Sequence, residues 1–394
     1  MSWTLTPIRK YLVIFGLCLG AVPLIGLINF VFLMNAGEFE PIDKIIEIQS
    51  QHDALFYSAL RTVTYPYKLS LFHHVKPRVV ALGASRVWQI RSQYFTGSFV
   101  NMGGAMASFK EGEAILRKMA ASHKPAVGIM GIDPWWFASG AGNFQMGTAT
   151  ATGQEFRLDM LFMPCDWLIR QKVSYQNYFK VLLGKTPSPI PAFGVTAVTR
   201  MDGFYKEGSY YDLGLVTGFH NLGDRKFEWV ESKIKAGSDA FKYDKSVSKD
   251  RWEEFISMVM FAQRENIHLI TFLTPLPPRI IDLMANMGDN YAYIDELRAM
   301  LPEVSKLSYD FFDPRSFGSS DCEFIDGIHG GEITYLRILL EISKDPASGL
   351  SPYLNLDKIV KCIDQYRGKA MVPPPFYKQP FIERDFLELG CKKP

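Results

Sequence analysis

The chain has 394 residues, of which 47% are apolar, so it can form the core of one large domain or of two smaller ones. Its 43 basic and 41 acidic residues leave a formal net charge of +2, and this balance gives no electrostatic case for a nucleic-acid partner. The sequence also contains no helix-turn-helix, zinc-finger or RNA-binding motif, so we expect no nucleic-acid binding.

The first predicted element is an apolar run over residues 11–34 that contains no charged side chain. The run is long enough for a transmembrane helix and too long for the core of an ordinary signal peptide. Arg9 and Lys10 precede it and acidic residues follow it, so the positive-inside rule places residues 1–10 in the cytoplasm. We therefore expect an uncleaved, single-pass signal anchor, with the remaining chain outside the cytoplasm.

Residues 35–76 are expected to form a membrane-proximal connector with a helical stretch from Ile42 to Tyr57. From residue 77 onward, short apolar runs alternate with helical patterns. The expected strands cover residues 78–82, 98–101, 126–132, 267–273 and 307–312, and the expected helices follow Ser85 and Ser108, begin at Lys249, cover residues 293–300 and follow Gly331. This alternation predicts an α/β fold with a doubly wound parallel sheet, in one domain over residues 77–345.

The alternation lapses over about residues 138–248, which we interpret as a large insertion. It contains one expected helix over about residues 159–183 and an expected turn at residues 199–203. Its aromatic content argues against disorder. The C-terminal residues 346–394, with three consecutive prolines, are expected to pack in an extended conformation across the surface.

The five cysteines include no C-x-x-C pair, so we expect no metal site and no cofactor. In an oxidising compartment, Cys322 can pair with either Cys362 or Cys391. The sequence leaves both pairings open.

A candidate nucleophile lies at the end of the strand predicted over residues 78–82. The strand stops at Gly83, and Ser85 follows at the start of the next predicted helix. Open α/β sheets bind ligands at the carboxyl ends of their strands, and a helix N-terminus offers free N–H groups there. Ser85 is therefore either a nucleophile or only the cap of that helix.

A candidate base and its partner occur together near the C-terminus. A serine hydroxyl needs a base to take its proton, and the base needs a third group to fix its tautomer. Asp326 precedes His329 by three residues in a loop that opens a helix, so its carboxylate can reach the imidazole. We expect Ser85, His329 and Asp326 to form a catalytic triad, with the Ser85 hydroxyl and the imidazole within or close to hydrogen-bonding reach.

Three short blocks, in this order, resemble those of the SGNH/GDSL hydrolase superfamily: Gly83-Ala84-Ser85-Arg86, Asn101-Met102-Gly103-Gly104 and Asp326-Gly327-Ile328-His329. The segment from Asp133 to Phe137 and the single anchor are similar to those of its membrane-anchored extracytoplasmic O-acyltransferases, such as D-alanyl-lipoteichoic-acid transfer and alginate O-acetylation proteins. The resemblance covers about residues 77–137 and 267–345. It implies an SGNH-hydrolase-like, flavodoxin-like sheet. It also implies an oxyanion hole at Gly103 and Gly104, in which the N–H of Ser85 acts together with that of Gly103 or Gly104.

One position departs from the superfamily pattern, because Asp133 stands where an asparagine donor is usual. An ionised carboxylate only accepts hydrogen bonds, so it cannot stabilise an oxyanion. Asp133 either binds a substrate hydroxyl or caps the following turn, and Arg86 either holds an anionic substrate group or packs against the sheet edge. The other candidate substrate-binding residues are Asn101, Trp135 and Trp136.

The resemblance implies an extracytoplasmic enzyme that transfers an acyl group, acetyl above all, through an acyl-serine to hydroxyls of a cell-surface or secreted polysaccharide. A polytopic membrane-bound O-acyltransferase is the expected partner that brings the acyl donor across the membrane. The expected location is the bacterial cell membrane, with the catalytic domain in the periplasm or on the cell surface. A carbohydrate esterase of the same fold and a non-catalytic polysaccharide-binding or assembly subunit stay open as alternatives.

Overall fold

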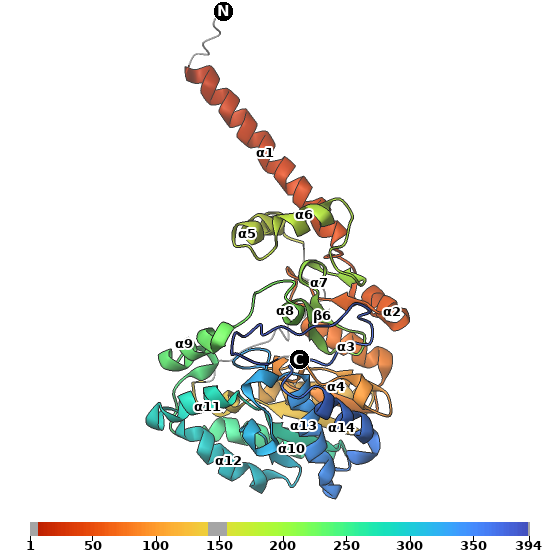
Figure 1. Ribbon diagram of the computed structural model, residues 1–394, viewed down its shortest axis with the longest axis vertical. Helices are drawn as coiled ribbons and strands as arrows, with labels where there is room; N and C mark the ends of the chain where they lie inside the picture. Colours follow the sequence, from red (N-terminus) through yellow and green to blue (C-terminus); the bar gives the residue numbers. More distant parts are fainter. Residues whose placement is uncertain (1–6, 141–155, 393–394) are drawn as a thin grey trace, which may run out of the picture.

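The computed structural model describes residues 7–140 and 156–392. The expected cytoplasmic tail, insertion and C-terminal tail therefore each lie partly outside the described residues. Figure 1 shows an elongated molecule, in which helix α1 (Pro7–Asn35) projects away from the rest of the chain.

Helix α1 has 29 residues and a mean hydropathy of 2.4 over its most apolar window, so it is long and apolar enough to cross a membrane. Only 6% of that window is buried against the rest of the chain. Its apolar side chains are therefore free to face lipid, which agrees with the anchor expected over residues 11–34.

Five short strands form one parallel sheet, and its three central strands are mainly apolar and buried, since both faces of the sheet are covered. The strands lie in the order β3-β2-β4-β8-β9, and all four pairings between neighbours are parallel. The bounds are β2 Val79–Leu82, β3 Phe99–Asn101, β4 Val127–Ile132, β8 Leu269–Leu273 and β9 Ser308–Asp310. The expected α/β class and the expected parallel sheet are confirmed.

Helices cover both faces of this sheet. Side chains alternate along β2, so Val80 and Leu82 belong to one core and Val79 and Ala81 to the other. The first core contains α4 (Phe109–Ser122), α10 (Lys249–Arg264) and α12 (Ala292–Val304), and the second contains α13 (Glu332–Lys344) and α14 (Leu356–Gln365). Helix α14 lies in the tail that the sequence predicts to be extended, so that prediction is wrong over this helix.

A second, mixed sheet joins the connector to the insertion. Its strands lie in the order β5-β1-β6-β7, and their bounds are β1 Leu55–Phe56, β5 Ala192–Phe193, β6 Asp202–Phe204 and β7 Tyr210–Asp212. The helix expected through Tyr57 is wrong in its end, because it stops earlier, as α2 (Ile42–Gln51). The turn expected at residues 199–203 is present but shorter, at Met201 with a positive φ of 63°, between α7 (Val195–Arg200) and β6.

The helix expected over residues 159–183 is divided into three pieces, η4 (Leu158–Phe162), α5 (Met163–Ile169) and α6 (Tyr175–Leu182). The break follows α5, where Gln171 adopts a positive φ of 55°. Contacts join both η4 and α6 to α1, and Figure 1 shows α5 and α6 beside the C-terminal part of α1.

The remaining helices are α3 (Thr64–Val75), α8 (Leu213–Thr217), α9 (Glu228–Ala236) and α11 (Pro278–Ala285). Single 3₁₀ turns are η1 Ser85–Val87, η2 Ser92–Tyr94, η3 Pro134–Phe137, η5 Arg225–Phe227, η6 Asp239–Phe241, η7 Gly288–Tyr291, η8 Pro314–Phe317, η9 Asp321–Glu323, η10 Pro346–Ser348 and η11 Ser351–Tyr353. A disulfide joins Cys322 in η9 to Cys391, which decides the pairing that the sequence leaves open.

Candidate active site

Ser85 lies directly after β2, at the carboxyl edge of the parallel sheet. Gly83 has a positive φ of 143°, and a Cβ there would lie 2.8 Å from the carbonyl oxygen of Gly131, so the chain can turn at this point only with glycine. The turn leads into η1, a single 3₁₀ turn, where the sequence predicts a longer helix. The capping position is Ala84, and the capping role considered for Ser85 is therefore wrong.

The loop that carries His329 is held by its own hydrogen bonds. Asp326 Oδ1 accepts from the backbone N–H groups of Ile328 and His329, at 2.7 and 2.6 Å. The other carboxylate oxygen, Oδ2, lies 2.7 Å from His329 Nδ1. The Asp-x-x-His spacing therefore builds a local turn that also orients the imidazole.

The loop brings His329 to Ser85 across the sheet edge. Ser85 Oγ lies 2.8 Å from His329 Nε2, and Asp326 lies on the opposite side of the imidazole ring. With the Nδ1 proton donated to Asp326, Nε2 is free to accept the proton of the serine hydroxyl. The geometry predicted from the sequence for these three side chains is confirmed.

The charges around the imidazole favour its protonated form. Burial by itself lowers the pKa of His329, but the charge and hydrogen bond of Asp326, together with the charge of Asp212, raise the pKa above its usual value of 6.5. Burial by itself raises the pKa of Asp326, and the bonds from His329 and from the backbone N–H groups bring that pKa below its usual range. Asp326 is thus ionised at neutral pH and stabilises an imidazolium.

The site lies where the strand order reverses. The chain leaves β2 for β3 on one side and returns to β4 on the other, and in open α/β sheets this reversal opens a crevice at the carboxyl ends. Ser85 follows β2, Gly103 follows β3 and Asp133 follows β4. The topology therefore gathers the loops that the sequence singles out.

The oxyanion hole implied at Gly103 and Gly104 is a wrong prediction. The N–H of Gly103 donates to Asn101 Oδ1 at 2.7 Å, and the N–H of Gly104 donates to the carbonyl of Gly83 at 2.9 Å. Asn101 also donates to the carbonyl oxygens of Val87 and Ile90 and is fully buried. Asn101 holds the turns after β2 and β3 together, so its expected substrate-binding role is wrong as well.

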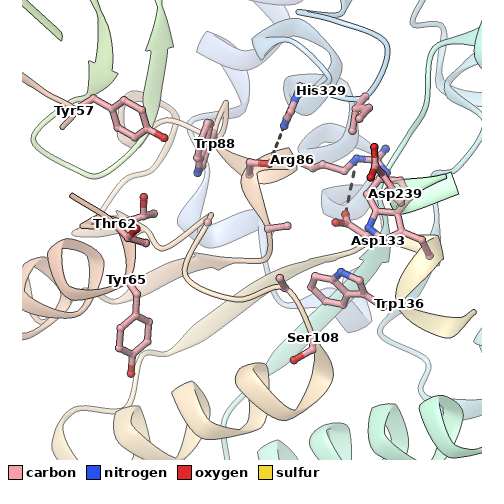
Figure 2. A pocket seen from close by; sticks show the side chains of 18 of the residues that line it. Tyr57, Thr62, Tyr65, Arg86, Trp88, Ser108, Asp133, Trp136, Asp239 and His329 are labelled. Carbon is pink, nitrogen blue, oxygen red and sulfur yellow. Dashed lines mark hydrogen bonds and ion pairs between the residues drawn. The ribbon is translucent and has the colours of Figure 1, made fainter. Parts of the chain in front are cut away.

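Trp88 is a site residue that the sequence analysis missed. Its indole ring stacks on the imidazole of His329, with ring centroids 6.2 Å apart and planes 11° apart. Its buried Nε1–H has no hydrogen-bond partner within the described chain. In Figure 2, Trp88 and His329 lie next to each other at the cavity wall. The only sequence signal is the position of Trp88 three residues after Ser85.

Arg86 and Asp133 form the other end of the site, and both are buried. Arg86 Nη2 donates to the carbonyl of Pro275, whereas its Nε and Nη1 have no hydrogen-bond partner among the described residues. Arg86 Nε lies 3.8 Å from Asp133 Oδ1 (Figure 2). Asp133 Oδ1 also accepts a hydrogen bond from Thr274. Asp133 makes no capping hydrogen bond, so the capping role considered for it is wrong.

Burial raises the pKa of Asp133, and the nearby Arg86 charge opposes that shift. A second carboxylate, Asp212 in β7, is partly buried and accepts from Gln89 at 2.8 Å. Desolvation, followed by the charge of Asp202, raises its pKa to about 7. Asp212 comes from the insertion, and no motif in the sequence predicts that its charge acts on His329.

Ser85 and His329 open into a cavity of about 890 Å³. Its lining includes Arg86, Asp133 and both candidate tryptophans, Trp135 and Trp136; Trp135 also lies under the Arg86 guanidinium. Six lysine or arginine side chains and two aspartates line it: Arg61, Arg86, Lys172, Arg200, Lys242, Arg251, Asp133 and Asp239. The cavity is therefore basic, aromatic and large enough for a sugar unit.

Comparison with protein-family models finds no match, and no curated protein or solved structure matches the chain either. The fold, the triad geometry and the cavity are therefore the observations from which a function can be argued.

Proposed function

We propose that the chain is an extracytoplasmic, serine-dependent O-acyltransferase of the SGNH/GDSL type. One observation carries the proposal: the series of contacts from Asp326 through His329 to Ser85 at the carboxyl edge of a parallel sheet. A serine beside an imidazole whose other nitrogen is bound to a carboxylate is the arrangement that nucleophilic acyl transfer requires. The strand order β3-β2-β4-β8-β9 supports the flavodoxin-like sheet of that superfamily.

In the proposed reaction, His329 Nε2 takes the hydroxyl proton of Ser85 while Oγ attacks the carbonyl carbon of the acyl donor. His329 then returns the proton to the leaving oxygen, and an acyl-serine forms. An acceptor hydroxyl gives its proton to His329 and attacks the acyl-serine, and His329 protonates Ser85 as the new ester leaves. The N–H of Ser85, at the first position of η1, and the indole N–H of Trp88 are the candidate oxyanion donors.

The cavity supports a carbohydrate acceptor that carries anionic groups. The half-buried Trp135 lines the cavity and can contact a sugar ring, whereas Trp136 is 5% exposed and packs against Phe109 in the core. Basic side chains outnumber acidic ones in the lining. In the buried guanidinium of Arg86, Nε and Nη1 have no hydrogen-bond partner in the described chain, although Nε lies 3.8 Å from Asp133 Oδ1, and Arg86 is the candidate contact for a carboxylate. We propose a cell-surface or secreted polysaccharide as the acceptor and acetyl as the transferred group.

The cavity lies near the segment that contacts α1, and this position supports delivery of the acyl donor from the membrane. Trp167 of α5 and Lys172, which follows α5, both line the cavity, and contacts join the neighbouring η4 and α6 to α1. A polytopic membrane-bound O-acyltransferase is the partner we propose for delivery of the acyl group. An esterase that uses water as the acceptor is the competing assignment, and the acceptor requirement distinguishes the two.

The test is acylation of surface polysaccharide in cells that carry Ser85→Ala, His329→Ala or both substitutions. We expect each single variant to be anchored normally and to reduce acylation to background. The double variant should be hardly worse than either one, because residues that act as a unit are strongly non-additive. A fluorophosphonate probe should label the wild type and not Ser85→Ala.

Intact acylation in Ser85→Ala cells would contradict the nucleophile assignment and favour a binding subunit. Purified protein that forms the acyl-serine but loses it to water at the same rate with and without a polysaccharide acceptor would instead favour an esterase.

A further inference from the structure

The segment of residues 156–185, which contains η4, α5 and α6, exposes an unusual amount of apolar surface. On α6 and the residue after it, Tyr175, Phe179 and Leu183 follow one another at four-residue intervals and are 62%, 57% and 72% exposed. These three side chains lie on one face of the helix, and other apolar side chains, Tyr178 and Val181, face inward. Further exposed apolar residues of the segment are Phe156, Leu158, Phe162, Met163 and Ile169.

The inward face of this segment is fixed to α1. Phe32 and Leu33 of α1 form one buried cluster with Trp167, Tyr178 and Val181. Asn29, a polar residue within α1, is also buried against the segment. Its amide donates to the carbonyl of Leu161 at 2.7 Å, and its Oδ1 accepts from Tyr178 at 2.6 Å.

The length of α1 determines at which depth in a bilayer the segment of residues 156–185 lies. Twenty residues from Tyr11 to Phe30 span about 30 Å, the thickness of the hydrocarbon core. Gly26 lies four residues before that end, about 6 Å below the edge of the core, and a side chain at Gly26 would contact Leu161 and Phe162. Ile28, inside this edge, and Val31 and Met34, just beyond it, are also partly exposed, so this part of α1 presents apolar surface as well.

The charges of the segment agree with this depth. It contains five basic and two acidic residues, and both acidic ones, Asp159 and Asp166, pair with Arg157 and Arg170. Its positive charge is therefore carried by the three lysines, Lys172, Lys180 and Lys185. Apolar side chains beside lysines are typical of a helix that lies in the interface with anionic headgroups.

We infer that residues 156–185 form a second membrane-binding element, which lies in the interface of the bilayer that α1 crosses. Interfacial helices sink their apolar face about 5–10 Å into the boundary of headgroups and acyl chains, which matches the depth set by Gly26. The inference needs α1 to cross the membrane and is independent of any catalytic role of Ser85. It also places the Trp167 end of the cavity next to the membrane surface.

The test uses full-length protein in vesicles of phosphatidylcholine with a minor share of phosphatidylglycerol. An environment-sensitive fluorophore is attached at Leu183→Cys or Ile169→Cys, after Cys18, Cys165 and Cys362 are changed to serine. Val360→Cys on α14 is the matched control, since Val360 is apolar and 41% exposed but lies far along the chain from the segment. Flotation with the vesicles first checks that α1 has inserted.

We expect doxyl-labelled lipid to quench the fluorophore at positions 169 and 183 several-fold more than it quenches the fluorophore at position 360. Aqueous iodide should give the reverse order. Equal quenching by iodide at all three positions would overturn the inference, because the segment would then lie in water. Protection of positions 169 and 183 from both quenchers would also overturn it, because a protein surface rather than lipid would then cover the segment.

Discussion

At the scale of single residues, the site depends on how one imidazole is held. Asp326 Oδ2 contacts His329 Nδ1, while its Oδ1 accepts from two backbone N–H groups of the same turn. The carboxylate therefore fixes the ring orientation and raises the pKa of His329, with Asp212 acting in the same direction and Arg86 against it. As the pH falls, His329 therefore becomes protonated, and stops acting as a base, at a higher pH than a free imidazole does.

The pH dependence of the reaction tests this arrangement. The neutral imidazole is the base, so kcat/KM for an activated ester should fall as the pH drops through the raised pKa of His329. Asp326→Asn removes the carboxylate that raises that pKa, so the acidic limb should move to lower pH. The maximal rate should fall by up to about 10⁴, because the tautomer is no longer fixed. The measurement is a pH profile of kcat/KM for both proteins.

Asp364→Asn is the control for that profile, since Asp364 is 67% exposed and its one ion pair within the described chain is with Arg367 at 3.8 Å. Its profile should match the wild type. An unmoved acidic limb in Asp326→Asn would contradict the role given to the carboxylate.

Trp88 offers a second test at this scale. Trp88→Phe keeps an aromatic ring beside His329 and removes the Nε1–H that has no partner in the described chain. If that N–H donates to the oxyanion, kcat should fall by roughly 10²–10³ with little change in KM. Steady-state kinetics with the same ester measure both constants. Trp252→Phe, outside the cavity, is the control, and an equal small effect of the two substitutions would remove Trp88 from the mechanism.

At the scale of elements, one buried ion pair connects the two loops of the site. Arg91 lies between η1 and η2, and Glu332 is the first residue of α13. The distance from Arg91 Nε to Glu332 Oε2 is 2.9 Å, and both side chains are buried. Tyr94 donates to the other carboxylate oxygen of Glu332 at 2.6 Å. Because Ser85 precedes Arg91 and His329 precedes Glu332, this contact helps to fix the distance between serine and histidine.

Glu332→Gln leaves the Arg91 charge buried without its carboxylate, and we expect it to destabilise the fold by roughly 3–5 kcal/mol. Glu341→Gln, on the same helix, breaks a pair with Lys344 that is open to solvent and should cost less than about 1 kcal/mol. Thermal unfolding of both variants in detergent measures the difference. Equal unfolding temperatures would show that the buried pair does not support the sheet edge.

At the scale of the whole molecule, the chain combines the apolar helix α1, a mixed sheet and a parallel sheet. Helix α1 is long and apolar enough to cross a membrane, and Figure 1 places the α/β part at the far end from the start of α1. The proposed extracytoplasmic location of that part is an oxidising one, in which the Cys322–Cys391 disulfide between η9 and the C-terminal tail would persist.

The direction of the anchor is tested by reporters fused at the C-terminus. A reporter that is active only outside the cytoplasm should be active, because Arg9 and Lys10 retain the N-terminus inside. A reporter that fluoresces only in the cytoplasm should stay dark at the same position. The opposite result would contradict the proposed extracytoplasmic reaction.

The sequence by itself determined those features that depend on near neighbours along the chain. The strands β2, β4 and β8 are mainly apolar runs, and α4 follows Ser108, whose hydroxyl accepts from the N–H of Glu111. The Asp326–His329 turn closes over three residues. In each case the backbone and its nearby side chains supply the hydrogen bonds, so a local pattern is sufficient to predict the structure.

Only the tertiary structure decided which distant groups meet. The mixed sheet pairs β1 with strands far along the chain, Arg91 pairs with Glu332, and Cys322 selects Cys391. The N–H groups of Gly103 and Gly104 satisfy internal acceptors instead of facing the cavity, because buried polar groups must find partners. Such contacts are chosen by the packing of the whole chain, and no short stretch of sequence contains both partners.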